Sequence, residues 1–92
     1  MHKEKKMKNF KTINYGAYNI LVAIVNDEIY FKTEDIKKTL NLDTYKEQMS
    51  NKTKFCGIDF ALDLAKSSSV YYKDGFALWL EYEYKSMKHD IL

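Results

Sequence analysis

The first patterned segment of the chain is apolar and rich in β-branched side chains: residues 18–25 read YNILVAIV. Such a run is typical of a strand that is buried on both faces. Asn26 and Asp27 follow, and both residue types tolerate the left-handed backbone of a tight turn. Residues 29–31, which read IYF, then resemble a returning strand. The pattern therefore predicts a β-hairpin.

The next segment, residues 33–49, changes to a spacing of about four, which is typical of helices. Thr33 is predicted to cap a first helix whose opening turn is acidic. A break at residues 41–42 precedes a second short helix, for which Asp43 is the predicted cap. The two helices are expected to form a compact αα unit. Their expected buried i, i+4 pairs are Ile36 with Leu40 and Tyr45 with Met49.

Residues 58–64 alternate between large apolar side chains and Asp or Ala, which favours a half-buried strand. A helix is the alternative here, because Ile58, Leu62 and Ala65 also share one helical face. With a serine turn at residues 67–69 and a partner strand at 70–72, the favoured interpretation is a second hairpin.

A final helix is predicted over residues 76–88. Its apolar face is expected to carry Phe76, Trp79, Leu80, Tyr84 and Met87. The predicted fold class is thus α+β: a β-hairpin, two short helices, a second β-hairpin and a C-terminal helix.

Charge divides the 92 residues unequally. Residues 1–11 carry five lysines and one glutamate, which predicts a flexible basic arm. Residues 12–92 carry a net charge of −2 and are expected to form a single domain. All fifteen basic residues are lysine, so the chain lacks the two-pronged donor that arginine offers to bases and phosphates. No signal-like or membrane-length apolar segment is evident, and we expect the protein to act in the cytoplasm.

Catalytic chemistry has little support in the sequence. Asp59 and Asp63 would lie about 13 Å apart on a strand, too far to share a metal ion. Cys56 is the only cysteine, and no glycine-rich phosphate loop occurs. We therefore expect no enzyme activity, no cofactor and no metal.

Binding has better candidates. Side chains suited to phosphates and base edges cluster within nine positions, and we predict that they form a nucleic-acid-binding site. They are Lys46, Gln48, Asn51, Lys52 and Lys54. A solvated helix and loop explain the same cluster without a ligand. Four tyrosines at positions 71, 72, 82 and 84 indicate either a stacking or protein-binding surface or core and half-buried positions.

Two segments resemble a known family. Residues 27–40 (DEIYFKTEDIKKTL) are similar to the opening of the BRO family N-terminal domain, a short strand followed by a helix. Residues 70–80 (VYYKDGFALWL) are similar to the family's second signature, in which an acid-glycine pair precedes an apolar helix. The resemblance implies a phage or mobile-element regulator of antirepressor type that binds DNA. The absence of arginine and the acidic body leave an alternative: a small phage anti-defence protein, like an anti-CRISPR, that inhibits a host protein by binding it.

Overall fold

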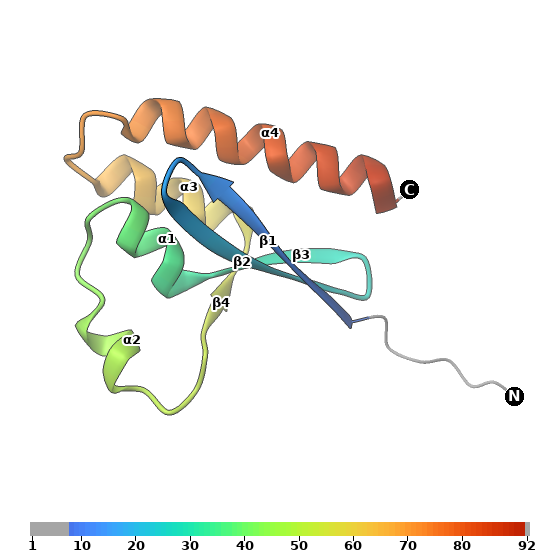
Figure 1. The fold of residues 1–92 in the computed structure, drawn as a ribbon, viewed down its shortest axis with the longest axis horizontal. Coiled ribbons are helices and arrows are strands. Elements are labelled where there is room, and N and C mark those ends of the chain that lie inside the picture. The colour runs from blue at the N-terminus through green and yellow to red at the C-terminus, as the bar shows by residue number, and fades with distance from the viewer. Residues whose placement is uncertain (1–7, 92) are drawn as a thin grey trace, which may run out of the picture.

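The computed structural model describes residues 8–91, which form an antiparallel sheet and four helices (Figure 1). The sheet has the order β1-β2-β3-β4. Its strands are β1 (Lys8–Tyr15), β2 (Tyr18–Val25), β3 (Glu28–Lys32) and β4 (Phe55–Cys56). The helices are α1 (Thr33–Thr39), α2 (Tyr45–Met49), α3 (Ile58–Ser67) and α4 (Lys73–Ile91). The predicted α+β class with a C-terminal helix is confirmed.

The hairpin predicted from the apolar run is also confirmed. It consists of β2 and β3, which pair in antiparallel register from Val22 opposite Phe31 to Val25 opposite Glu28. The turn residues Asn26 and Asp27 have φ angles of 53° and 68°. Asn and Asp adopt this left-handed conformation more readily than most residues, which explains the tight reversal at this point.

Strand β1 extends the sheet at a place where the sequence pattern predicts no strand. It pairs with β2 along its whole length, from Lys8 opposite Val25 to Tyr15 opposite Tyr18. Gly16, at φ 61°, makes the connecting turn. The predicted boundary of the basic arm is therefore wrong, because residues 8–11 belong to the sheet. Residues 1–7 of that arm lie outside the described residues.

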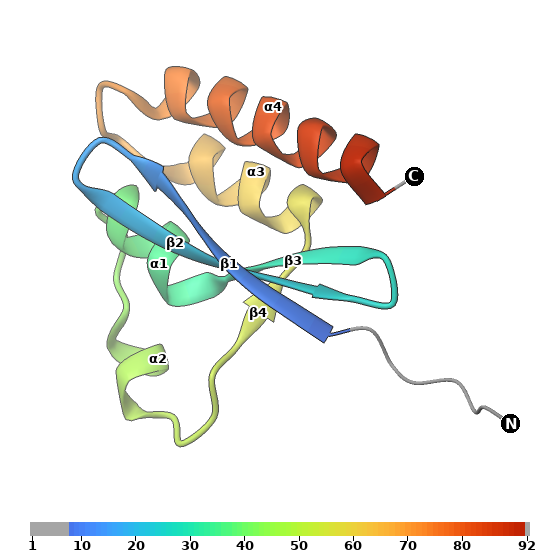
Figure 2. The ribbon, with the colours of Figure 1, turned by 45° about the vertical axis from the view of Figure 1, so that its right-hand side comes forward.

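The sheet has one covered face. Helices α1, α3 and α4 all pack on it, and α3 and α4 run side by side (Figures 1 and 2). Cross-strand partners share a face, so the register assigns Ile20, Val22 and Phe31 to this side. The side chains that are completely buried between sheet and helices are Ile20, Val22, Phe31, Ile36, Leu40, Phe76 and Leu80.

The second predicted hairpin is wrong, since residues 58–67 form helix α3 and residues 70–72 belong to the connection before α4. In the alternating pattern, Ala61 and Ala65 counted as solvent-facing positions. In the helix they lie one turn apart and are the two buried residues of α3. Alanine and leucine also favour helices, and Ile58 is the only β-branched residue in the segment. Small side chains let α3 pack closely against its neighbours, above all α4.

Helix α1 is held by polar contacts at both ends. Strand β3 pairs with β2 only from Val22 onward, and beyond that point the carboxylate of Asp35 accepts the Leu21 backbone N–H at 2.9 Å. At the other end, the Tyr72 hydroxyl donates to the carbonyl of Thr39 at 2.6 Å. Thr33 is the first helical residue and not a cap, and no side chain caps this helix.

Helix α4 begins three residues earlier than predicted and ends three later. Phe76, Leu80 and Met87 are buried, as the predicted apolar face requires. Trp79 and Tyr84 are only partly buried against the core. The Tyr15 ring of β1 lies 5.0 Å from that of Trp79 and 5.1 Å from that of Phe76, so an aromatic cluster joins the edge of the sheet to α4.

Candidate nucleic-acid interface

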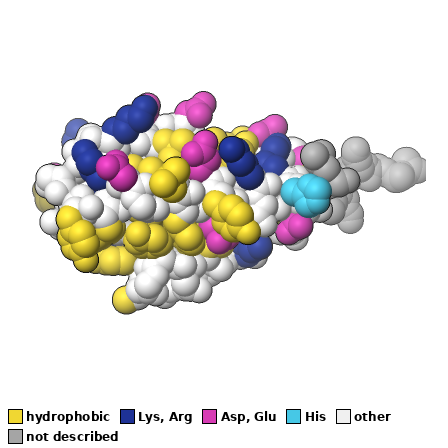
Figure 3. Space-filling model, turned by 90° about the horizontal axis from the view of Figure 1, so that it is seen from above, with side chains coloured by type: hydrophobic (Ala, Val, Ile, Leu, Met, Phe, Trp, Pro, Cys, Tyr) yellow, Lys and Arg dark blue, Asp and Glu magenta, His cyan; other side chains and the backbone are white. Residues whose placement is uncertain are grey.

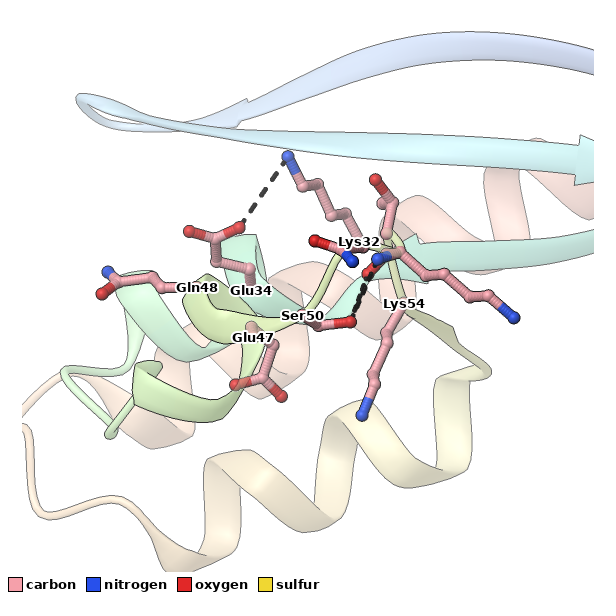
Figure 4. A pocket seen from close by; sticks show the side chains of 9 residues that line it. Lys32, Glu34, Glu47, Gln48, Ser50 and Lys54 are labelled. Atoms are coloured by element: carbon pink, nitrogen blue, oxygen red, sulfur yellow. Dashed lines mark hydrogen bonds and ion pairs between the residues drawn. The ribbon is translucent and has the colours of Figure 1, made fainter.

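A polar pocket of about 360 Å³ lies where the segment between α2 and β4 returns to the sheet (Figure 4). Its walls come from the end of β3, the start of α1, the end of α2 and the segment after α2. The lining residues are Lys32, Glu34, Glu47, Gln48, Ser50, Asn51, Lys52, Thr53 and Lys54. Lysine, amide and hydroxyl groups dominate this set, and the pocket is therefore suited to an anionic ligand with polar edges.

Backbone contacts fix the position of the returning segment. The Thr33 N–H donates to the carbonyl of Lys54 at 3.0 Å, next to the β3–β4 pair of Lys32 and Phe55. The Ser50 hydroxyl accepts the Lys52 N–H at 3.0 Å and donates to the Lys52 carbonyl at 3.1 Å. These bonds hold residues 50–54 beside the end of β3 although α2 and its flanks contribute little to the core.

Both acids in the pocket are paired. Glu34 lies 3.1 Å from the Lys38 ammonium and 4.0 Å from that of Lys32. Glu47 accepts a hydrogen bond from Lys37 at 2.9 Å, and this bond is the largest factor that lowers the pKa of Glu47 from its ordinary value of 4.5. The second carboxylate oxygen of Glu47, Oε1, is buried and has no hydrogen-bond partner among the described residues.

The pocket carries a local excess of positive charge. The lining residues and their ion-pair partners comprise five lysines and two glutamates, an excess of three positive charges. Lys52 and Lys54 are exposed, and neither lies within 4.0 Å of an acid in residues 8–91. The lysine excess therefore faces solvent, although residues 12–92 as a whole are slightly acidic.

Four of the five residues predicted to bind nucleic acid line this pocket: Gln48, Asn51, Lys52 and Lys54. The fifth, Lys46, lies on α2, is exposed and is not part of the lining. The related expectation that Tyr45 and Met49 are buried is wrong. Their exposed fractions are 62% and 66%, and no residue of α2 is buried. The Lys37–Glu47 pair attaches α2 to α1 in place of an apolar contact.

The sequence cluster omits Lys32, which is the pocket lysine nearest the sheet. Figure 4 shows the Lys32 side chain reaching from β3 toward Glu34, while the Lys54 side chain points in a different direction. Lys32 is sixteen positions before Gln48, so sequence spacing gives no reason to group them. The signal available was its place at the junction of the predicted strand and helix, a common location for ligand-binding residues.

Exposed apolar side chains also occur on α4 and just before it, and none of them lines the polar pocket. Tyr71, Leu78 and Tyr82 have exposed fractions of 97%, 70% and 69%. In a view from the side of α4, hydrophobic side chains form a band along one side and charged side chains lie mostly along the other (Figure 3). A groove between α3 and α4 adjoins Leu78. Tyr72 and Tyr84 are partly buried against the core, so only two of the four tyrosines are available to a partner.

Metal and thiol chemistry have no candidate site within residues 8–91. Because α3 is a helix, Asp59 and Asp63 are one turn apart and not 13 Å apart as a strand would place them. Both are exposed, and no group of three potential ligands occurs in the described part of the chain. Burial raises the pKa of the Cys56 thiol, which favours the unreactive neutral form.

Comparisons of the chain with protein-family models, with curated protein sequences and with solved structures give no match. In the described residues, no helix is both long and apolar enough to cross a membrane.

Proposed function

We propose that the protein is a nucleic-acid-binding regulator of the antirepressor type, similar to the BRO family N-terminal domain and encoded by a phage or mobile element. The observation that carries the proposal is the convergence of Gln48, Asn51, Lys52 and Lys54 on one pocket with a lysine excess. Their chemistry and their close sequence spacing both favour one site, to which the fold adds Lys32 of β3.

The proposed contacts are of two kinds: ionic contacts to phosphates and hydrogen bonds to base edges. Lys32, Lys52 and Lys54 act as point charges that neutralise phosphates, which fixes the position of the nucleic acid. The amides of Gln48 and Asn51 offer both donors and acceptors, the groups required to contact base edges. Because Glu34 and Glu47 are paired with lysines, they oppose the approach of phosphates only weakly.

Salt dependence tests this proposal. Each phosphate neutralised on a duplex contributes a slope of about −0.9 to log K against log salt. We expect a slope of about −3 in log K against log salt for three lysine contacts. Lys52→Ala with Lys54→Ala should remove two of these contacts and bring the slope to about −1. Lys46→Ala with Lys66→Ala is the matched control, because it removes the same charge from exposed positions outside the pocket.

The control pair should leave most of the slope in place. Equal losses in the two double variants would show that net charge, and not the pocket, governs binding. If the protein binds neither duplex nor single-stranded DNA at low salt, the proposed function is wrong.

A second candidate function is that of a phage anti-defence protein that binds and inhibits a host protein. The exposed Tyr71, Leu78 and Tyr82 favour it, since large apolar side chains rimmed by charge are typical of protein interfaces. The test is phage plating on a host with an active defence system. The wild-type protein should allow the phage to form plaques on this host. Leu78→Lys with Tyr82→Lys should abolish plaque formation, whereas Lys52→Ala with Lys54→Ala should leave it intact.

A further inference from the structure

The face of the sheet opposite the helices is not covered in residues 8–91. The register assigns Phe10, Ala23 and Tyr30 to one cross-strand row on this face. Phe10 is 56% exposed and Tyr30 is 37% exposed. By contrast, Ala23 is only 4% exposed, so the two rings and their neighbours cover the small side chain between them.

These rings surround a shallow hollow of about 370 Å³. Phe55 of β4 completes it, with its ring centroid 6.5 Å from that of Phe10. Val25 contributes to the apolar lining, and Lys8 stands at the rim. The hollow therefore offers exposed aromatic rings and an apolar floor, with a cation within reach.

The aromatic hollow adjoins the polar pocket. Lys32 lines the polar pocket and Phe55 lines the hollow, and the two residues are partners across the β3–β4 pair. On β3, Lys32 and Tyr30 are two residues apart, about 7 Å along the strand. Lys54, next to Phe55 in sequence, belongs to the polar pocket. One continuous surface thus presents rings for stacking beside lysines for phosphates.

We propose that this surface binds unpaired nucleic acid, with bases stacked on Phe10, Tyr30 and Phe55 and phosphates held by Lys8, Lys32 and the lysines of the polar pocket. The proposal rests on the proposed nucleic-acid function and names its ligand as a single strand. In a duplex the faces of the bases are already stacked on one another, and an aromatic side chain gains a stacking partner only from an unpaired base.

The charge of this surface favours a nucleic-acid strand over an apolar protein segment as its ligand. Lys8 lines the hollow, Lys32 lies two residues beyond Tyr30 on β3, and Lys52 and Lys54 continue the positive charge in the adjoining polar pocket. Glu28 is the one acid that the register of residues 8–91 assigns to this face, and it shares a cross-strand row with Val25 and Lys8 at the end of β3 away from Lys32. A group of rings flanked by lysines suits a strand whose unpaired bases stack while its phosphates are neutralised.

The test compares a labelled oligothymidylate with a DNA duplex by fluorescence anisotropy at low salt. Phe10→Leu with Tyr30→Leu keeps apolar side chains but removes the rings. We expect the affinity for the single strand to fall about tenfold or more and the affinity for the duplex to be unchanged. Phe10→Tyr keeps a ring and should retain binding. Tyr82→Leu, which removes an exposed ring from α4, is the matched control.

The possible results separate this inference from the proposed function. If the leucine variant binds the single strand as tightly as the wild type while Lys52→Ala with Lys54→Ala weakens binding, the function stands and the stacking surface is wrong. Binding of duplex alone by the wild type leads to the same conclusion. Failure of the wild type to bind either nucleic acid overturns both. If the wild type binds an apolar peptide and the leucine variant binds the same peptide equally well, this face is a protein interface instead.

Discussion

The two faces of the same sheet use aromatic residues in opposite ways. On the covered face, Phe31 lies opposite Val22 and both are completely buried under the helices. One residue further along β2, Ala23 lies between Phe10 and Tyr30, whose rings remain exposed on the other face. A strand alternates its side chains between faces, so adjacent residues of one strand contribute separately to the core and to the proposed binding surface. Substitutions can therefore affect one face and spare the other.

The largest expected effect is on the covered face. Phe31→Ala should reduce the free energy of unfolding by about 3–5 kcal/mol, because it leaves a cavity in the centre of the core. Phe10→Ala, on the open face, should change it by less than about 1 kcal/mol. Urea unfolding monitored by circular dichroism measures both. Similar losses in the two variants would contradict the division of the sheet into a structural face and a binding face.

An intermediate effect is expected where the covered face meets solvent. Trp79 is partly buried, and its ring lies 5.0 Å from that of Tyr15 and 5.6 Å from that of Phe76. Trp79→Ala should cost about 1–3 kcal/mol, less than the removal of a completely buried aromatic. Tyr82→Ala, an exposed position on the same helix, should cost less than about 0.5 kcal/mol. A loss for Trp79→Ala no greater than that of the control would show that the aromatic cluster does not hold β1 to α4.

The elements predicted correctly from the sequence are those that short-range patterns determine. Residues 18–31 contain their apolar strands and their turn residues together, so the hairpin is visible locally. Strand β1 is different, because only Ile13 among its residues is buried. It is stabilised by pairing with β2 and by the contacts of Tyr15, and neither partner is visible in the pattern of residues 8–15. Helix α3 was mistaken for a strand because the burial of Ala61 and Ala65 depends on close packing against the rest of the fold.

The candidate site shows the same division. Gln48, Asn51, Lys52 and Lys54 are close in sequence, so residue type and spacing indicate them without knowledge of the fold. Lys32 and the aromatic hollow required the fold. Phe10, Tyr30 and Phe55 are separated by about twenty residues or more, and only the strand order places them on one face. Lys46 lies outside the pocket lining, and because α2 has no buried residue the spacing of its side chains does not indicate which way Lys46 points.

A smaller effect than those of Phe31 and Trp79 is expected in the ion pair that attaches α2 to α1. Lys37→Met removes the hydrogen bond to Glu47, whose side chain is only 9% exposed and already has one unpaired oxygen. We expect a loss of about 1–2 kcal/mol at neutral pH, because a carboxylate that is largely buried loses its charged partner. Glu47→Gln combined with Lys37→Met should recover part of this loss, since no buried charge then remains.

The pH dependence gives this prediction its sign. The hydrogen bond from Lys37 lowers the pKa of Glu47 below 4.5, so the folded state favours the ionised carboxylate more than the unfolded state does. The resulting stability is fully present above pH 4.5 and disappears as the pH falls through the lowered pKa of the folded state.

The difference in unfolding free energy between the wild type and Lys37→Met, measured in urea, should therefore shrink from neutral pH to about pH 3. A difference that stays constant over this range would show that the Lys37 side chain acts through packing and not through its charge. A loss of oligonucleotide binding that accompanies the loss of the ion pair would connect this contact to the pocket, because α2 carries Gln48 and leads into the lysine-bearing segment.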